Sequence, residues 1–157
     1  MSRKVANILY GLSSLATAPM TPRLRLKTKA GLVAKMQRDL TDRVETPQGT
    51  LSLFTSRSSN IAAAVSGFLT DEPETLAWID SMQAGDTFWD IGANIGLYSL
   101  YAGLRGDLNV YGFEPSALNY GLMAEHIVQN KLDKNVSALC VAVGAETGLL
   151  KLYGAYA

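Results

Sequence analysis

Hydrophobic and polar positions in the first third of the chain predict helices followed by a hairpin. Residues 5–18 are mildly apolar, and the apolar residues of 29–40 recur at the spacing of one helix face. Leu51 and Leu53 then alternate with polar neighbours, as in a half-buried strand, and the turn over 47–49 joins them to a preceding strand. A two-stranded hairpin is therefore expected after the helices.

The next segment predicts two more helices. Residues 61–69 are apolar enough for a short helix, and a strong helix start follows at 70–74. There Asp71 can cap the helix and Pro73 fits its first turn. Three apolar residues of this helix would face the core, namely Leu76, Ile79 and Met82.

The second half of the chain alternates between strands and helices. Three apolar segments, over 87–90, 108–113 and 136–143, are interpreted as strands separated by helical patterns. This order predicts an α/β fold with a doubly wound parallel sheet. A short return strand over 149–153 is also expected.

Charge divides the chain in a way that the zero net charge hides. Residues 1–43 contain nine Lys and Arg against two Asp and Glu, and residues 44–157 contain five against twelve. The acidic body argues against wholesale nucleic-acid binding, which needs a basic face. We interpret 1–42 as a basic helical arm, 43–84 as a hairpin with capping helices, and 85–157 as the cofactor-binding half of a domain.

The basic arm has two interpretations. Arg23, Arg25, Lys27 and Lys29 would meet anionic headgroups if the arm lies on a membrane surface. The arm is otherwise a solvated helix, which is favoured because charged arms are usually solvated faces. With one cysteine and no run of about 20 apolar residues, the chain is expected in the cytoplasm, at most peripheral to the inner membrane surface.

The strand over 87–90 begins the segment with the clearest indication of a ligand-binding site. It ends at Asp90 and leads through a turn from Gly92 to Gly96 into a helix, a unit that opens many α/β nucleotide sites. Glu114 ends the next strand 18 residues after Gly96, close to the roughly 20-residue spacing of a ribose-binding acid. The pattern G-x-x-x-G differs from the G-x-G-x-x-G of nicotinamide dinucleotide sites, which disfavours an NAD-dependent reductase.

Several strings carry a family resemblance: Asp90-Ile-Gly-Ala-Asn-Ile-Gly-Leu-Tyr-Ser99, Phe113-Glu-Pro-Ser116, Asp71-Glu-Pro-Glu-Thr-Leu-Ala-Trp-Ile-Asp80 and Ala142-Val-Gly144. Together they resemble S-adenosylmethionine-dependent methyltransferases of the FkbM family over about residues 43–153. The resemblance implies a Rossmann-like class I methyltransferase sheet, of which only strands one to three are present. A later motif of that family is absent, and the chain is therefore expected to be truncated.

The resemblance also implies roles at matched positions. Asp90 and the loop backbone would hold the methionine end of S-adenosylmethionine, Asn94 would shape the loop, and Glu114 would bind the ribose hydroxyls. The implied cofactor-binding residues are Asp90, Gly92, Ala93, Asn94, Gly96, Glu114, Pro115, Ala142 and Val143, the last two at the adenine edge. Plainer alternatives exist: Asp90 as a helix cap, Asn94 as a turn residue, and Glu114 as a solvated strand end.

The implied activity is methyl transfer to a hydroxyl of a small molecule such as a sugar, glycolipid or polyketide. No catalytic base is identifiable, because His126 is expected to be structural. Cys140 is expected in the core, Trp78 and Trp89 in packing, and no His/Cys cluster has metal-ligand spacing. The alternative is a non-catalytic cofactor-binding fragment held to a membrane or a partner by its basic arm. The sequence leaves the oligomeric state open.

Overall fold

Two units make up the chain, Met1–Leu40 and Thr41–Ala157, and each is described by itself. The computed structural model describes residues 3–39, 41–55, 58–149 and 151–153. Leu40, the last residue of the helical pattern predicted over 29–40, lies outside the described residues.

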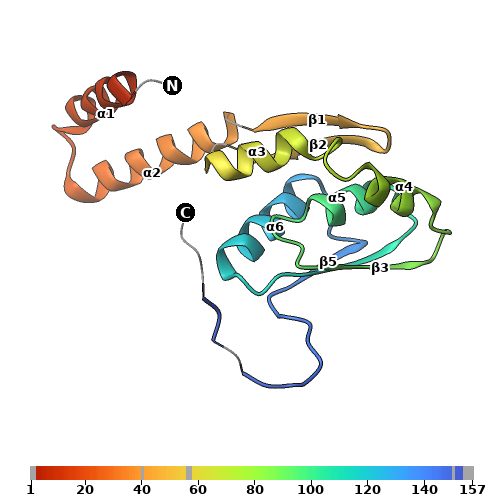
Figure 1. The fold of residues 1–157 in the computed structure, drawn as a ribbon. Coiled ribbons are helices and arrows are strands. Elements are labelled where there is room, and N and C mark those ends of the chain that lie inside the picture. Colours follow the sequence, from red (N-terminus) through yellow and green to blue (C-terminus); the bar gives the residue numbers. More distant parts are fainter. Residues whose placement is uncertain (1–2, 40, 56–57, 150, 154–157) are drawn as a thin grey trace. The chain divides into compact units, whose positions relative to one another are not determined.

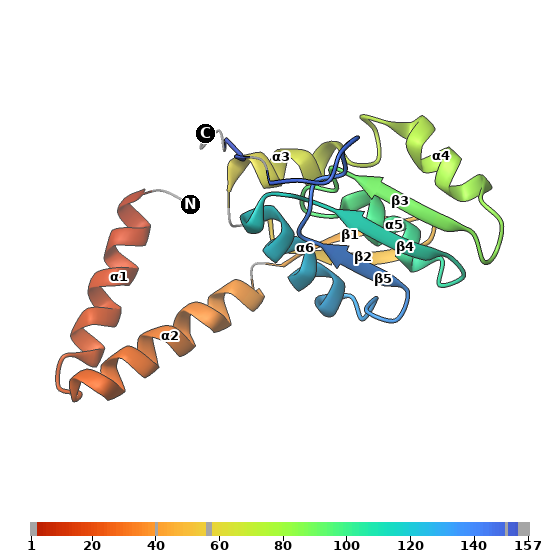
Figure 2. The same ribbon diagram turned by 90° about the horizontal axis from the view of Figure 1, so that it is seen from below.

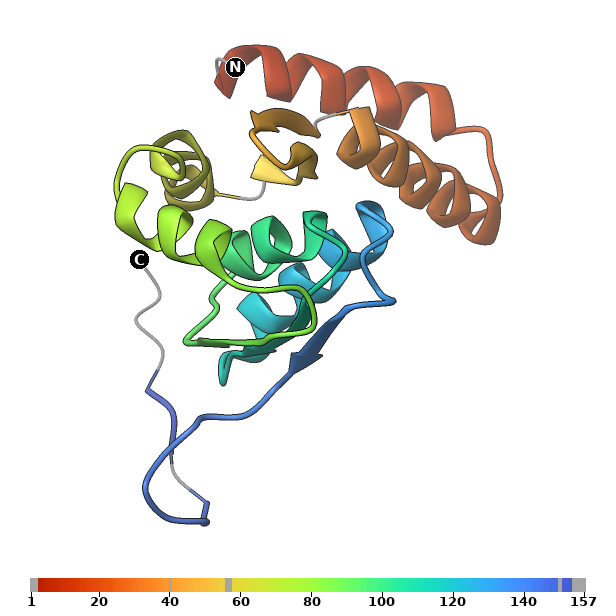
Figure 3. The same cartoon turned by 90° about the vertical axis from the view of Figure 1, so that its right-hand side faces the viewer.

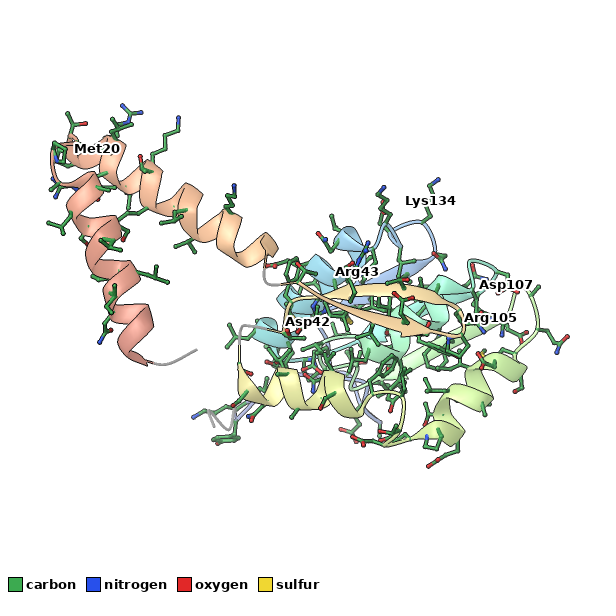
Figure 4. All side chains as sticks on the ribbon, turned by 90° about the horizontal axis from the view of Figure 1, so that it is seen from above. Met20, Asp42, Arg43, Arg105, Asp107 and Lys134 are labelled. Carbon is green, nitrogen blue, oxygen red and sulfur yellow. The ribbon has the colours of Figure 1, made fainter. Side chains whose placement is uncertain are left out.

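The first unit is a pair of helices, α1 (Arg3–Thr17) and α2 (Pro22–Asp39), that turn back on each other near Met20 (Figure 3, Figure 4). Arg25 stabilises this turn, because its guanidinium donates to the Thr17 carbonyl at 3.1 Å and to the Ala18 carbonyl at 2.7 Å. These carbonyls lie at the end of α1, where helical partners run out. α2 begins seven residues before the predicted start at residue 29.

Most apolar residues of this unit are exposed. On α1, Ile8, Leu12 and Leu15 recur at the spacing of one helix face, with exposed fractions of 62%, 58% and 72%. The side of α1 that contacts α2 carries Ser14 instead, which accepts a hydrogen bond from Lys29 at 3.3 Å. No helix in the described part of the chain is both long and apolar enough to cross a bilayer.

The second unit begins with the predicted hairpin. Its strands β1 (Asp42–Thr46) and β2 (Gly49–Leu53) pair antiparallel, and Leu51 and Leu53 are fully buried. Two helices follow, α3 (Ser59–Gly67) and α4 (Pro73–Ser81). The rest alternates as predicted: β3 (Thr87–Ile91), α5 (Leu97–Leu104), β4 (Asn109–Phe113), α6 (Ala117–Gln129) and β5 (Val136–Leu139).

A parallel three-stranded sheet, in the order β3-β4-β5, confirms the predicted α/β class and forms half of a Rossmann-like sheet. Both crossover helices, α5 and α6, lie on the same face of it, as a common crossover hand requires. The hairpin packs on the other side of these helices, so the unit has three layers (Figure 1, Figure 2).

The core lies between the sheet and its helices. Phe88, Val110 and Val136 point into it from the three strands, and Leu100 and Met123 meet them from α5 and α6. Leu76 and Ile79 of α4 are buried and Met82 is partly buried, as predicted.

The opposite face of the sheet is apolar and exposed. Trp89 and Ile91 of β3 are 57% and 58% exposed, and Tyr111 of β4 is 39% exposed. Trp89 packs edge-on against Phe113 on this face. Trp78 of α4 packs edge-on against the core residue Phe88 and is 56% exposed. No helix in the described ranges covers this face.

Four predictions for this unit were wrong. The third strand ends at Leu139 rather than at residue 143, because its ladder partner β4 ends at Phe113, opposite Leu139. Cys140 is therefore exposed and not in the core. The return strand is absent from the described residues of 149–153. Glu72, not Asp71, is the N-cap residue of α4, and it forms no side-chain cap bond.

Gly112 of β4 allows the helices to approach the sheet, and this makes a testable prediction. A Cβ there would lie 2.8 Å from Ser99 Oγ and 2.9 Å from Met123 Sδ, so Gly112→Ala is expected to lower the free energy of unfolding by about 1–3 kcal/mol. Gly121→Ala is the control, because nothing lies within 4 Å of its added Cβ and alanine favours a helix by up to about 1 kcal/mol. Urea unfolding should show opposite signs, and equal signs would contradict the packing argument.

Candidate functional site

The loop between β3 and α5 has a backbone that few residue types accept. Gly92 has φ 80°, Asn94 has φ 53° and Gly96 has φ 86°, all in the left-handed region that glycine and asparagine tolerate best. The Gly92 and Ala93 amides both donate to the Phe113 carbonyl, at 2.9 and 3.0 Å. The loop is thereby fixed against the end of the neighbouring strand β4.

Asp90 is the penultimate residue of β3, and its side chain lies at the beginning of α5. Its Oδ2 accepts hydrogen bonds from the Ser99 amide at 3.0 Å and from the Ser99 hydroxyl at 2.6 Å. The Ser99 amide is one of the helix-start donors that have no partner within the helix. Asp90 therefore caps this helix. Its negative charge lies at the positive end of the helix dipole, which is a favourable interaction.

Burial raises the pKa of Asp90 above its ordinary value of 3.8, although the two Ser99 bonds act in the opposite direction and the charge of Glu114 adds to the increase. The ionised form is thus held in a place that disfavours charge. Such carboxylates are common at functional sites.

Glu114 directly follows β4 and is 6% exposed. Its Oε2 accepts the Asn94 amide and its Oε1 accepts the Ser116 amide, both at 2.8 Å. The alternative interpretation of Glu114 as a solvated strand end is therefore excluded. Each carboxylate oxygen has two acceptor sites, so one site on each oxygen is left after these bonds. Ser116 is the N-cap residue of α6, but its side chain makes no cap bond.

A pocket of about 290 Å³ opens beside the loop, close to the roughly 300 Å³ lower limit for small-molecule sites. Three carboxylates line it, those of Asp71, Glu72 and Asp90. Its other lining residues are Ala64, Phe68, Gly92, Ala93, Asn94, Ile95, Leu97 and Tyr98. None of the lining residues is basic, so the pocket favours a cationic ligand group over an anionic one.

Tyr98 lies on the wall of this pocket and is neutral at physiological pH. Burial, together with the hydrogen bond and charge of Glu72, raises the pKa of its hydroxyl to about 12. A tyrosine of this kind donates a hydrogen bond and does not act as a general base at neutral pH.

The nine predicted cofactor residues are not all brought together. Asp90, Gly92, Ala93 and Asn94 line the pocket, and Gly96 is buried at the start of α5. Glu114 joins them through the Asn94 amide, with Pro115 partly buried after it. Ala142 and Val143 lie in an exposed segment beyond β5, so their adenine contact stays a prediction.

His126 is structural, as predicted, but it is fully buried rather than solvated. The Phe54 amide donates to its Nε2 at 3.0 Å, and its Nδ1 lies 3.0 Å from the Ile95 carbonyl oxygen. Both ring nitrogens therefore bond backbone groups, so His126 does not serve as a catalytic base. Among the described residues, no group of His, Cys, Asp and Glu is arranged to hold a metal ion.

Sequence reasoning missed residues that support the site from neighbouring elements. Ser99 holds Asp90, and Ala64 of α3 and Phe68, the C-cap residue of α3, form part of the pocket wall. Ser99 had a usable signal, because it is the third residue of α5 and follows an acid at the preceding strand end. The α3 residues had none, since only the tertiary structure brings them to the loop.

No protein-family model and no curated protein matches the chain, so membership of the FkbM family stays a prediction. Solved structures are similar to it at low identity. TYW2 from Pyrococcus horikoshii, in complex with MeSAdo, is 18% identical with a TM-score of 0.47, covering 66% of this chain and 37% of that one. A SAM-dependent methyltransferase from Agrobacterium tumefaciens is 12% identical with a TM-score of 0.48, covering 64% and 32%. Precorrin-6y C5,15-methyltransferase from Geobacter metallireducens is 22% identical with a TM-score of 0.39, covering 43% and 36%. The chain thus spans between 32% and 37% of the length of these structures.

The pKa of Asp90 gives a prediction for stability. A carboxyl whose pKa is raised on folding contributes stability that is fully present below pH 3.8 and is lost as the pH rises through the native pKa. Relative to Asp90→Asn, which is neutral at every pH, the natural chain should therefore lose free energy of unfolding as the pH rises from about 4 to 7. Urea unfolding of both proteins across this range measures the difference. A difference that does not change with pH would contradict the burial argument.

Proposed function

We propose that the chain carries the S-adenosylmethionine-binding part of a methyltransferase. One observation carries the proposal: two carboxylates, those of Asp90 and Glu114, end neighbouring parallel strands on either side of a loop with left-handed residues. Ligands of such sheets bind beyond the carboxyl ends of the strands. The motif strings that contain these residues resemble the same class of enzyme.

The charges of the site support a cofactor without phosphates. A dinucleotide places its pyrophosphate at the start of the first crossover helix. Here Asp90 already accepts the Ser99 amide of that helix, and Asp71 and Glu72 add negative charge to the pocket. A phosphate would be repelled, whereas the sulfonium and ammonium groups of S-adenosylmethionine would be attracted.

Glu114 fits the role of ribose acceptor. Its carboxylate is buried and fixed by two backbone amides, and one acceptor site on each oxygen is left for a vicinal pair of hydroxyls. Hydrogen bonds to a charged acceptor are among the stronger ones, at about 1.5–3 kcal/mol each.

The proposed reaction transfers a methyl group to a hydroxyl of a sugar, glycolipid or polyketide. S-adenosylmethionine supplies an electrophilic methyl group on its sulfonium. The residues of this chain would bind and orient the cofactor. Correct orientation of two reactants supplies a large part of the rate enhancement of an in-line transfer. No described residue stands out as the base, and the alternative function is that of a non-catalytic cofactor-binding segment.

The cofactor proposal is tested by calorimetry with S-adenosylmethionine, S-adenosylhomocysteine and NAD. We expect the two adenosyl compounds to bind and NAD not to bind. Glu114→Gln removes the charged ribose acceptor and should weaken binding more than tenfold, since one hydrogen bond to a charged group exceeds 1.4 kcal/mol. Glu146→Gln makes the same change at an exposed position and should leave the affinity unchanged. Absence of adenosyl binding, or binding of NAD, would refute the proposal.

We also propose that the Met1–Leu40 unit contacts an anionic membrane surface. The apolar face formed by Ile8, Leu12 and Leu15 supports this, because an exposed apolar helix face in a basic segment binds headgroup regions. Residues 1–40 contain eight Lys and Arg against one Asp.

Vesicle co-sedimentation tests the membrane proposal. The chain should sediment with phosphatidylglycerol vesicles, and Leu12→Asp should abolish this by placing a charge in the apolar face. Asn7→Asp adds the same charge at an exposed position of α1 outside that face and should have a smaller effect. Equal loss in both variants, or no sedimentation of the natural chain, would contradict the proposal.

A further inference from the structure

We infer that His126 is a positioning residue of the cofactor loop, and this inference rests on the proposed function. It lies in α6, is fully buried and does not line the pocket. Its ring joins two segments that are distant in sequence, the end of the hairpin at Phe54 and the loop at Ile95.

The two ring nitrogens have opposite roles. An amide N–H is only a donor, so the bond from Phe54 at 3.0 Å requires an unprotonated Nε2. A neutral imidazole then carries its proton on Nδ1, which donates to the Ile95 carbonyl at 3.0 Å. The ring also stacks on that of Phe54, with centroids 5.5 Å apart and planes within 13°.

The Ile95 carbonyl is the important acceptor, because of where it lies in the loop. Ile95 stands between the left-handed residues Asn94 and Gly96, at φ 53° and 86°, and its carbonyl is part of the peptide bond to Gly96. Glu114 holds one side of this turn through the Asn94 amide, and His126 holds the other through the Ile95 carbonyl. A left-handed turn that contains a non-glycine residue costs free energy and persists only where its surroundings fix it.

A neighbouring residue allows the role of His126 in the loop to be tested separately from its role in binding the hairpin. Asn130 lies one turn after His126 and bonds the same hairpin strand, since its Oδ1 accepts the Ser52 amide at 2.7 Å and its Nδ2 donates to the Ser52 carbonyl at 2.9 Å. No bond joins Asn130 to the loop among the described contacts. Asn130 Nδ2 also donates to the His126 carbonyl at 2.8 Å, at the end of α6. Asn130→Ala therefore weakens the docking of the hairpin and the end of α6, and it removes no bond to the loop.

Two substitutions at position 126 divide the functions of the ring. The amide nitrogen of asparagine takes the place of Nδ1, so His126→Asn keeps a donor for the Ile95 carbonyl and loses the acceptor for Phe54. The terminal group of glutamine reaches the place of Nε2, so His126→Gln keeps an acceptor for Phe54 and loses the donor to the loop. Both variants should lower the free energy of unfolding.

The experiment compares these variants in two measurements below the unfolding transition. The first is amide hydrogen exchange at Asn94 and Gly96 without cofactor, and the second is affinity for S-adenosylhomocysteine by calorimetry. In His126→Gln we expect loop exchange to accelerate and affinity to fall, each about fivefold, the ratio that the loss of one ordinary hydrogen bond gives. In His126→Asn and Asn130→Ala both quantities should stay within about twofold of the natural chain.

Two outcomes would overturn the inference: unchanged loop exchange in His126→Gln, or equal losses in all three variants in proportion to stability. Failure of the proposed function has a different signature. In that case the natural chain does not bind the cofactor, and the exchange measurement alone decides whether His126 fixes the loop.

Discussion

The buried carboxylate of Glu114 is the constraint on which the geometry of the site depends. It accepts the Asn94 amide from the loop after β3 and the Ser116 amide from the corner after β4. The connection from β3 to α5 and the connection from β4 to α6 are thus both held by the Glu114 carboxylate. Removing these donors would leave a buried charge without partners, which is among the most costly defects in a folded protein. The start of α5, the left-handed turn and the start of α6 consequently have fixed relative positions.

The same site keeps features that do not favour folding. Asp90 is partly buried in a place that disfavours its charge, Asn94 adopts a left-handed conformation, and three carboxylates border one pocket. The hairpin and α6 compensate from outside, since Asn130, directly after α6, bonds Ser52 of β2, and His126 of α6 bonds both Phe54 and the loop. Strain at a binding site supported by a well-bonded surrounding is a common arrangement in proteins.

The sequence predicted those parts of the fold that depend on local pattern. Strand periodicity, the glycine spacing and the acids at strand ends located β3, β4 and the loop correctly. The length of β5 was misjudged because an apolar run carries no information on where its partner strand ends, and that partner stops at Phe113.

Residues that act across the fold escaped the same reasoning. A single histidine in the middle of a helix gives no indication that its ring will meet the Ile95 carbonyl, 31 residues away. The pocket wall from α3 is equally invisible to local pattern. The observed N-cap residue of α4, Glu72, lies one position after the predicted one, Asp71. Both residues are acceptable before a proline, and only the backbone conformation distinguishes them.

The uncovered apolar face of the sheet has a consequence for the behaviour of the chain in solution. Trp89 and Ile91 lie on β3, which within the described residues is paired along one edge only. An unpaired edge beside exposed aromatic groups is the usual starting point of strand-to-strand aggregation. We therefore expect aggregation in solution to begin at β3, and shielding of that strand to raise the concentration at which the protein stays dispersed.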